Sequence, residues 1–150
     1  MARILLTRPM LRAHDIAKRF EDAGHSVHHA PVMEIACQNP PLPDDLGRYS
    51  GLLVTSASAA ACLPPGVIDA FAAKPSLATG PATAAALTEA GFKQVTHFGG
   101  EMEGLTAALS QRAARGEARW LYPCGTVLSH TPGALMARTG AQITPIDVYD

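Results

Sequence analysis

Short apolar runs alternate along this chain with longer, alanine-rich stretches in which apolar residues recur at helical spacing. The first run, residues 3–7, predicts a buried strand, and residues 11–23 carry an apolar position every three or four residues, as a helix does. Gly24 follows where helices favour a terminal glycine, and residues 27–31 predict a second strand. Together they predict one β-α-β unit with right-handed parallel pairing.

A proline-rich break separates this unit from the rest of the chain. Residues 40–43 hold three prolines in four positions, which neither a helix nor a central strand accommodates. We interpret the break as a boundary or an extended linker. The unit before it is too small to bury a core by itself, so we expect it to need further packing partners.

Beyond the break, strand and helix patterns alternate again. Five apolar runs predict strands at residues 52–55, 76–79, 94–97, 119–122 and 142–146. The helical patterns between them cover residues 57–63 with 67–73, 82–90, 102–114 and 132–139. This alternation predicts an α/β fold, a doubly wound parallel five-stranded sheet with helices on both faces.

Composition and charge exclude several kinds of partner. The 150 residues carry a net charge of −1 and no run of lysines and arginines, so no basic field would hold nucleic acid. With 47% apolar and 17% charged residues the chain is globular rather than disordered. Its apolar runs are too short for a secretory signal or for the ~20 residues of a membrane span. We therefore expect no nucleic-acid and no membrane partner.

The three cysteines, Cys37, Cys62 and Cys124, are far apart and form no C-x-x-C motif. We therefore expect neither a disulfide framework nor a zinc site, and a reduced, cytoplasmic compartment. Cys124 is expected at a strand-helix junction, where it would be a small buried packing residue or, less favoured, a thiol of lowered pKa. No histidine spacing, Walker loop or glycine-rich phosphate loop points to a metal or a nucleotide.

Small and hydroxyl-bearing residues follow the predicted strands. Ligands of open α/β sheets bind where strands end and helices begin, and free N–H groups at helix starts favour anions. The edge that holds Ser56, Thr79, Thr83 and Gly125 would therefore suit a ligand with many carboxylates. The alternative for Ser56, Thr79 and Thr83 is that they only cap helices.

Tyr149 follows the last predicted strand, where the chain would leave the sheet. A tyrosine there is able to reach a cleft between domains and to act as a hydrogen-bond donor or weak acid. The alternative is an amphipathic residue at a domain boundary.

Taken in order, these segments resemble the uroporphyrinogen-III synthase family along the whole chain. The resemblance rests on Ile4-Leu5-Leu6-Thr7-Arg8-Pro9, Leu52-Leu53-Val54-Thr55-Ser56-Ala57, Gly80-x-x-Thr83-Ala84-x-x-Leu87, Gly91-Phe92, Gly140-Ala141 and Val148-Tyr149. Each motif is weak, but their order and spacing together are specific.

The resemblance implies two flavodoxin-like domains joined by a two-stranded linker. Residues 1–32 would be the β-α-β portion of an incomplete first domain, residues 33–36 a linker strand, residues 37–145 a complete second domain, and residues 146–150 the start of the return linker. Matches to the family's later cleft segments would lie after Asp150. We therefore expect little synthase activity from this polypeptide, and a first unit that is mobile or shielded by self-association, although the family is monomeric.

The implied reaction is that of a cofactor-independent lyase of haem biosynthesis. It cyclises hydroxymethylbilane, a linear tetrapyrrole polycarboxylate, with inversion of ring D. By resemblance, Tyr149 matches the tyrosine thought to assist departure of the terminal hydroxyl, and Ser56 and Thr83 match positions that contact substrate. Arg8, Ala57 and Gly125 complete the expected substrate-binding set.

Two other functions stay open on the sequence. A non-catalytic tetrapyrrole-sensing or interaction domain would keep the fold and bind without turnover. A flavodoxin-like nucleotide binder is disfavoured because no phosphate loop is present.

Overall fold

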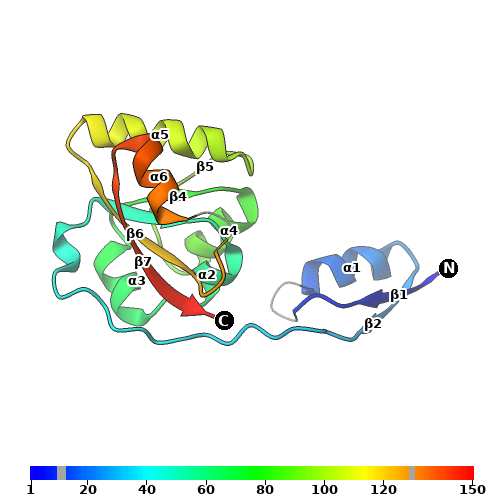
Figure 1. The fold of residues 1–150 in the computed structure, drawn as a ribbon. Coiled ribbons are helices and arrows are strands. Elements are labelled where there is room, and N and C mark those ends of the chain that lie inside the picture. The colour runs from blue at the N-terminus through cyan, green and yellow to red at the C-terminus, as the bar shows by residue number, and fades with distance from the viewer. Residues whose placement is uncertain (10–12, 129–130) are drawn as a thin grey trace. The chain divides into compact units, whose positions relative to one another are not determined.

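A computed structural model of the chain describes residues 1–9, 13–128 and 131–150. It divides into two compact units, Met1–Ala36 and Cys37–Asp150, each of which is described by itself (Figure 1). The start of the helix predicted over residues 11–23 lies outside the described residues.

The first unit is a β-α-β motif, as its apolar pattern predicts. Strand β1 (Arg3–Leu6) pairs in parallel with β2 (Ser26–His29), and helix α1 (His14–Asp22) connects them. Among its described residues the buried apolar side chains are those of Leu6, Ala13 and Ala17, with half-buried neighbours around them. So small a core supplies little hydrophobic stabilisation.

The second unit is built on a five-stranded parallel sheet in the order β5-β4-β3-β6-β7. Every neighbouring pair in it is parallel, which confirms the predicted α/β fold. The strands are β3 (Gly51–Val54), β4 (Pro75–Ala78), β5 (Gln94–His97), β6 (Arg119–Gly125) and β7 (Gln142–Tyr149).

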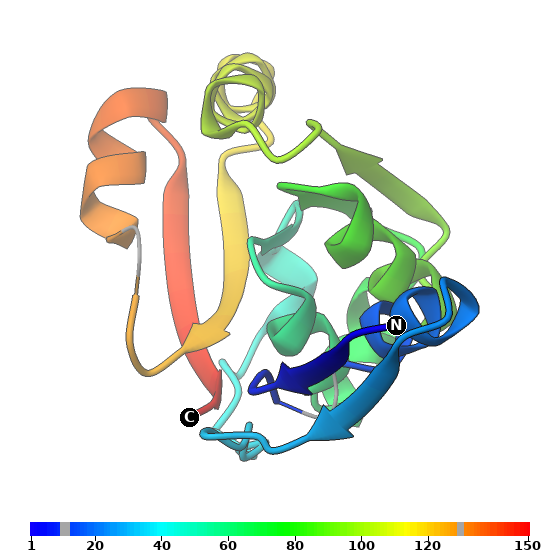
Figure 2. The same ribbon diagram turned by 90° about the vertical axis from the view of Figure 1, so that its right-hand side faces the viewer.

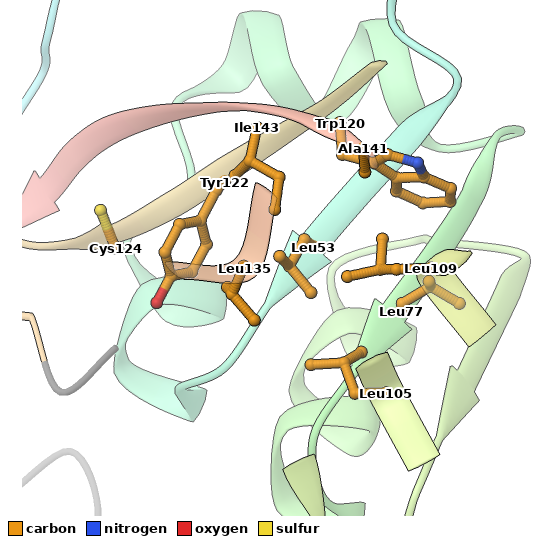
Figure 3. Close-up of a cluster of buried hydrophobic side chains, with 10 residues drawn as sticks. All are labelled: Leu53, Leu77, Leu105, Leu109, Trp120, Tyr122, Cys124, Leu135, Ala141 and Ile143. Atoms are coloured by element: carbon orange, nitrogen blue, oxygen red, sulfur yellow. The ribbon is translucent and has the colours of Figure 1, made fainter. Parts of the chain in front are cut away.

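Helices cover both faces of this sheet (Figure 2). They are α2 (Ala57–Ala61), α3 (Pro65–Phe71), α4 (Pro81–Glu89), α5 (Met102–Ala114) and α6 (Pro132–Thr139), and a short 3₁₀ helix, η2 (Leu46–Arg48), precedes β3. Helix α5 packs beside α6, and α2 packs beside α4. Under α5 and α6 lies a cluster in which Trp120 and Tyr122 meet Leu105, Leu109 and Leu135 (Figure 3).

The last strand extends beyond its predicted end. The apolar pattern predicts Ile146 as its last residue, but β7 continues to Tyr149 and stays paired with β6 as far as Gly125. Ile146 and Val148 are buried, so both remain anchored to the sheet. Residues 33–36, the expected first linker strand, form no strand; one antiparallel bridge lies just beyond them, between Cys37 and Tyr149. The division into two domains and a linker stays a prediction.

The expectation that no disulfide forms is wrong. Cys37 and Cys62 are 25 positions apart in sequence, yet their Cα atoms lie 5.1 Å apart and a disulfide joins their sulfurs. Sequence spacing carries no information on this distance, because the fold brings the two segments together. A cytoplasmic location stays a proposal, since the cysteine pattern no longer supports it.

Gly51, the first residue of β3, lies where the packing of the second unit leaves no room for a side chain. A Cβ there would lie 2.2 Å from the Pro75 carbonyl oxygen and 2.6 Å from the Trp120 ring. The first atom belongs to a neighbouring strand and the second to a fully buried side chain, so neither yields easily. We expect Gly51→Ala to lower the free energy of unfolding by about 1–3 kcal/mol in urea titrations.

The matched control for this change is Gly133→Ala. Gly133 lies in helix α6, and a Cβ there would meet nothing within 4 Å. We expect the control to be neutral or slightly stabilising, because alanine favours a helix over glycine by up to about 1 kcal/mol. Equal urea midpoints for the two variants would contradict the packing argument.

Candidate functional site

Tyr149 lies at the carboxyl end of β7, opposite Gly125 on β6. The register shifts there: Cys124 pairs with Asp147 and Gly125 with Tyr149, so Val148 is one extra residue on β7. A bulge of this kind re-aims the side chain that follows it. It leaves Val148 buried and Tyr149 half-buried at the end of the sheet.

The Tyr149 ring rests against Gly125. A Cβ on Gly125 would lie 2.8 Å from Cζ, 2.9 Å from Cε2 and 3.1 Å from the hydroxyl of Tyr149. These are shorter than ordinary van der Waals contacts, so a side chain here would displace the ring. Gly125 thus contacts the candidate catalytic residue, and its predicted contact with substrate stays a prediction.

Ser56 meets Tyr149 from the end of β3. The Tyr149 hydroxyl donates a hydrogen bond to Ser56 Oγ at 3.4 Å. Ser56 also caps α2, because the same oxygen accepts from the Ser58 N–H at 3.1 Å. A serine oxygen accepts two hydrogen bonds and donates one. With both acceptor positions used, the Ser56 proton stays available for a ligand oxygen.

A second hydroxyl pair, which sequence reasoning missed, lies at the same sheet edge. Thr55 Oγ1 and the Tyr122 hydroxyl are 2.9 Å apart, and Thr79 Oγ1 donates to the Thr55 carbonyl oxygen at 3.2 Å. Burial raises the pKa of Tyr122, although the hydrogen bond to Thr55 acts in the opposite direction. These contacts join the middle of β6 to the ends of β3 and β4, and Thr55 directly precedes Ser56. The sequence offered one sign of this pair, since Thr55 and Tyr122 are each the last residue of a predicted strand.

The other predicted site residues are placed as follows. Ala57 is the first residue of α2, directly after Ser56. Thr83 is the third residue of α4 and is only 5% exposed. The N-cap of α4 is Gly80, so neither Thr79 nor Thr83 is the cap that the alternative interpretation expects. Arg8 is an exposed residue of the first unit. Substrate contacts of Ala57, Thr83 and Arg8 stay predictions.

Cys124 is a buried free thiol near the end of β6. Burial, with the nearby Asp147 carboxylate as the second cause, raises its pKa to about 11. The thiol lies 3.5 Å from the Ile146 carbonyl oxygen, to which it donates. The interpretation of Cys124 as a thiol of lowered pKa is therefore wrong, and it is a packing residue.

The raised pKa predicts a slow reaction of Cys124 with iodoacetamide. At pH 8 roughly a thousandth of the native thiol is ionised, against about a quarter in the unfolded chain. We expect native labelling to be at least about 100-fold slower than labelling in urea. Mass spectrometry of timed samples measures both rates, and equal rates would contradict the burial argument.

The same shift predicts that stability falls at high pH. The folded pKa lies above the unfolded one, so folding favours the neutral thiol, and this contribution is complete below about pH 8.5. It is lost as the pH rises toward about 11. Urea titrations across this window should show a smaller pH dependence in Cys124→Ser, which cannot titrate there.

Within residues 1–9, 13–128 and 131–150, no group of three or more His, Cys, Asp or Glu side chains is arranged to hold a metal ion. No helix in the same ranges is long and apolar enough to cross a membrane.

Comparisons with known proteins agree with this fold. A family model described as uroporphyrinogen-III synthase HemD matches residues 14–150. A crystal structure of a mutant uroporphyrinogen III synthase from the extremely thermophilic bacterium Thermus thermophilus superposes with a TM-score of 0.57 at 20% identity, covering 99% of this chain and 62% of that one. The wild-type form gives a TM-score of 0.48 at 20% identity, covering 99% of this chain and 61% of that one.

The chain therefore spans about three-fifths of the length of these solved structures. At 20% identity, the likeness to the mutant structure shows the fold alone. No curated protein matches the chain significantly.

Proposed function

The chain belongs to the uroporphyrinogen-III synthase family, and from this premise we propose that it serves the cyclisation of hydroxymethylbilane with inversion of ring D. The substrate would be a linear tetrapyrrole bearing several carboxylates. The reaction loses the terminal hydroxyl, passes through a spiro intermediate and closes the ring, with no metal or organic cofactor.

The observation that supports this proposal is the contact of Tyr149 with Ser56 and Gly125. Tyr149 is a half-buried hydrogen-bond donor whose ring is seated on Gly125 and whose hydroxyl reaches Ser56 Oγ. In the proposed step the Tyr149 O–H turns from Ser56 to the terminal hydroxyl of the bilane and donates to it as the C–O bond breaks, and that hydroxyl leaves as water. Ring closure later releases one proton from a pyrrole carbon, which balances the proton taken up by the leaving group.

Ser56 has a separate role in the proposal. Its oxygen accepts from the Ser58 N–H, and from Tyr149 until that hydroxyl turns to the bilane, so we assign the proton of Ser56 to a substrate oxygen. A hydrogen bond of this kind to a carboxylate is charge-assisted and therefore strong. We assign Ala57, Thr83 and Arg8 to further substrate contacts, with Arg8 as a partner for a carboxylate.

The test is the isomer ratio formed from hydroxymethylbilane by a purified protein that carries this chain within the complete family fold. The bilane also closes unaided to the uninverted isomer I, so a protein-free reaction is the control. Isomer III above that control supports the synthase. Saturable binding of a uroporphyrinogen-like polycarboxylate without isomer III supports the non-catalytic alternative, and the absence of both contradicts the proposal.

A further inference from the structure

The Cys37–Cys62 disulfide joins two segments that hold the two members of the Tyr149–Ser56 pair. Cys37 forms an antiparallel bridge with Tyr149, and the next residue, Gln38, donates its N–H to the Val148 carbonyl oxygen at 2.7 Å. The main chain at Cys37 thus runs alongside the end of β7. The disulfide connects this segment to Cys62, at the end of α2.

Cys62 is itself tied closely to Ser56. It is the C-cap of α2, and its N–H bonds to the carbonyl oxygens of Ser58 and Ala59. The helix has only five residues, Ser56 caps its other end, and Ala59 and Ala60 bury it in the core. Cys62 and Ser56 therefore move as one body, because fewer than two helical turns separate them.

These contacts form a closed ring. It runs from the Tyr149 main chain to Cys37, through the disulfide to Cys62, along α2 to Ser56, and back through the hydrogen bond to the Tyr149 hydroxyl. The Tyr149–Ser56 hydrogen bond that closes the ring is 3.4 Å long, near the upper limit of hydrogen-bond distances. A shift of a few tenths of an ångström between β7 and α2 would break it.

We propose that Cys37 and Cys62 are positioning residues whose disulfide sets the Tyr149–Ser56 geometry, so that reduction of this disulfide loosens the pair. The catalytic consequence rests on the proposed function, but the positioning itself does not. Pairing with β6 keeps the Tyr149 main chain in the sheet after reduction, so the effect falls on the contact with Ser56 rather than on the fold.

The segment at Cys37 depends on the disulfide because it has few other attachments near the site. Cys37 and Gln38 are exposed, and no strand includes them. Three of the next five residues, Pro40, Pro41 and Pro43, have no N–H with which to join the sheet. Without the disulfide, this one bridge, of which the Gln38 hydrogen bond is part, would hold the segment to β7, and such an isolated contact opens readily.

The exposure of Cys37 also gives a reductant its point of attack. A thiolate of a dithiol attacks the Cys37 sulfur, the S–S bond breaks, and Cys62 leaves as a thiolate. The second thiol of the dithiol then attacks the reductant's other sulfur, which is bonded to Cys37 in the mixed disulfide, and Cys37 is released. The dithiol loses two electrons and becomes a disulfide, and its two thiol protons balance the two cysteine thiolates.

The first experiment is a digest of the whole polypeptide under non-reducing conditions, read by mass spectrometry. We expect the Cys37 and Cys62 peptides to be linked and Cys124 to be free. The second measures the oxidised and the dithiothreitol-reduced protein by NMR. We expect the Gln38 amide to exchange about tenfold faster after reduction and the Tyr149 ring signals to shift.

Two controls separate positioning from a general loss of structure. The first control is Tyr49, which precedes β3 and whose hydroxyl donates to Thr144 Oγ1. Its ring signals should stay unchanged. Cys37→Ser should resemble the reduced protein and should not respond to dithiothreitol. Reoxidation with the cyclic disulfide of dithiothreitol should restore the original signals in the wild type and not in the variant.

The inference is overturned if both cysteines stay free after reoxidation, or if reduction leaves the Gln38 exchange and the Tyr149 signals unchanged. In the isomer III assay, reduction is expected to lower kcat more than it changes KM, since the pair acts on the departing hydroxyl. If no isomer III forms at all, the proposed function fails, whereas the mass and NMR measurements still decide whether the disulfide positions the pair.

Discussion

Tyr149→Phe, made in a protein that carries this chain within the complete family fold, is expected to lower kcat for isomer III by about two to four powers of ten. The variant keeps the ring that rests on Gly125 and removes only the hydroxyl that donates to Ser56. Stability should change by less than about 1 kcal/mol, because one long, half-buried hydrogen bond is lost. Stopped assays with chromatographic separation of isomers I and III measure the rate.

Tyr49→Phe is the matched control for this prediction. Tyr49 is also half-buried, and its hydroxyl also donates to a side-chain hydroxyl, Thr144 Oγ1 at 3.1 Å. It precedes β3, whereas the candidate site lies where the strands end. We expect nearly unchanged kcat in this control. If Tyr149→Phe also kept full kcat, Tyr149 would be the amphipathic boundary residue of the alternative interpretation.

Gly125→Ala is expected to lower the same kcat by about a hundredfold, although it adds only one methyl group. That methyl would lie 2.8–3.1 Å from three atoms of the Tyr149 side chain, so the ring and its hydroxyl must move away from their place beside Ser56. Misplacing a reacting group by about 1 Å costs rate on this scale. The accompanying loss of stability should be about 1–3 kcal/mol.

We expect the loss of kcat in Gly125→Ala to act through Tyr149, whose ring the added methyl group displaces. In a double-mutant cycle, Gly125→Ala should therefore cost little further kcat once Tyr149→Phe is present. Gly133→Ala, where the added methyl meets nothing within 4 Å, should leave kcat unchanged. Fully additive losses from Gly125 and Tyr149 would show that Gly125 acts on something else, and its predicted contact with substrate would be the first candidate.

The local pattern of apolar and turn residues predicted most of the helices and strands. Helix α6 begins and ends at the predicted residues, and β5 does too, because turn residues and helical or strand periodicity act within a few positions. Predicted strand ends were wrong where the end depends on a residue distant in sequence. The end of β7 depends on how far β6 continues beside it, and both strands run three residues past their predicted ends.

The amino-acid sequence by itself determined the alternation of strands and helices, and it placed Ser56, Gly125 and Tyr149 each after a predicted strand. The tertiary structure alone decided that Tyr149 contacts both Ser56 and Gly125, because the Tyr149–Ser56 bond spans 93 positions and a one-residue bulge sets the ring over Gly125. It alone joined Cys37 to Cys62 and placed the Cys124 thiol beside Asp147, where burial and this carboxylate raise the pKa of the thiol. Periodicity reports which face of an element is buried, whereas a contact between distant segments depends on register and packing, which no short window of sequence contains.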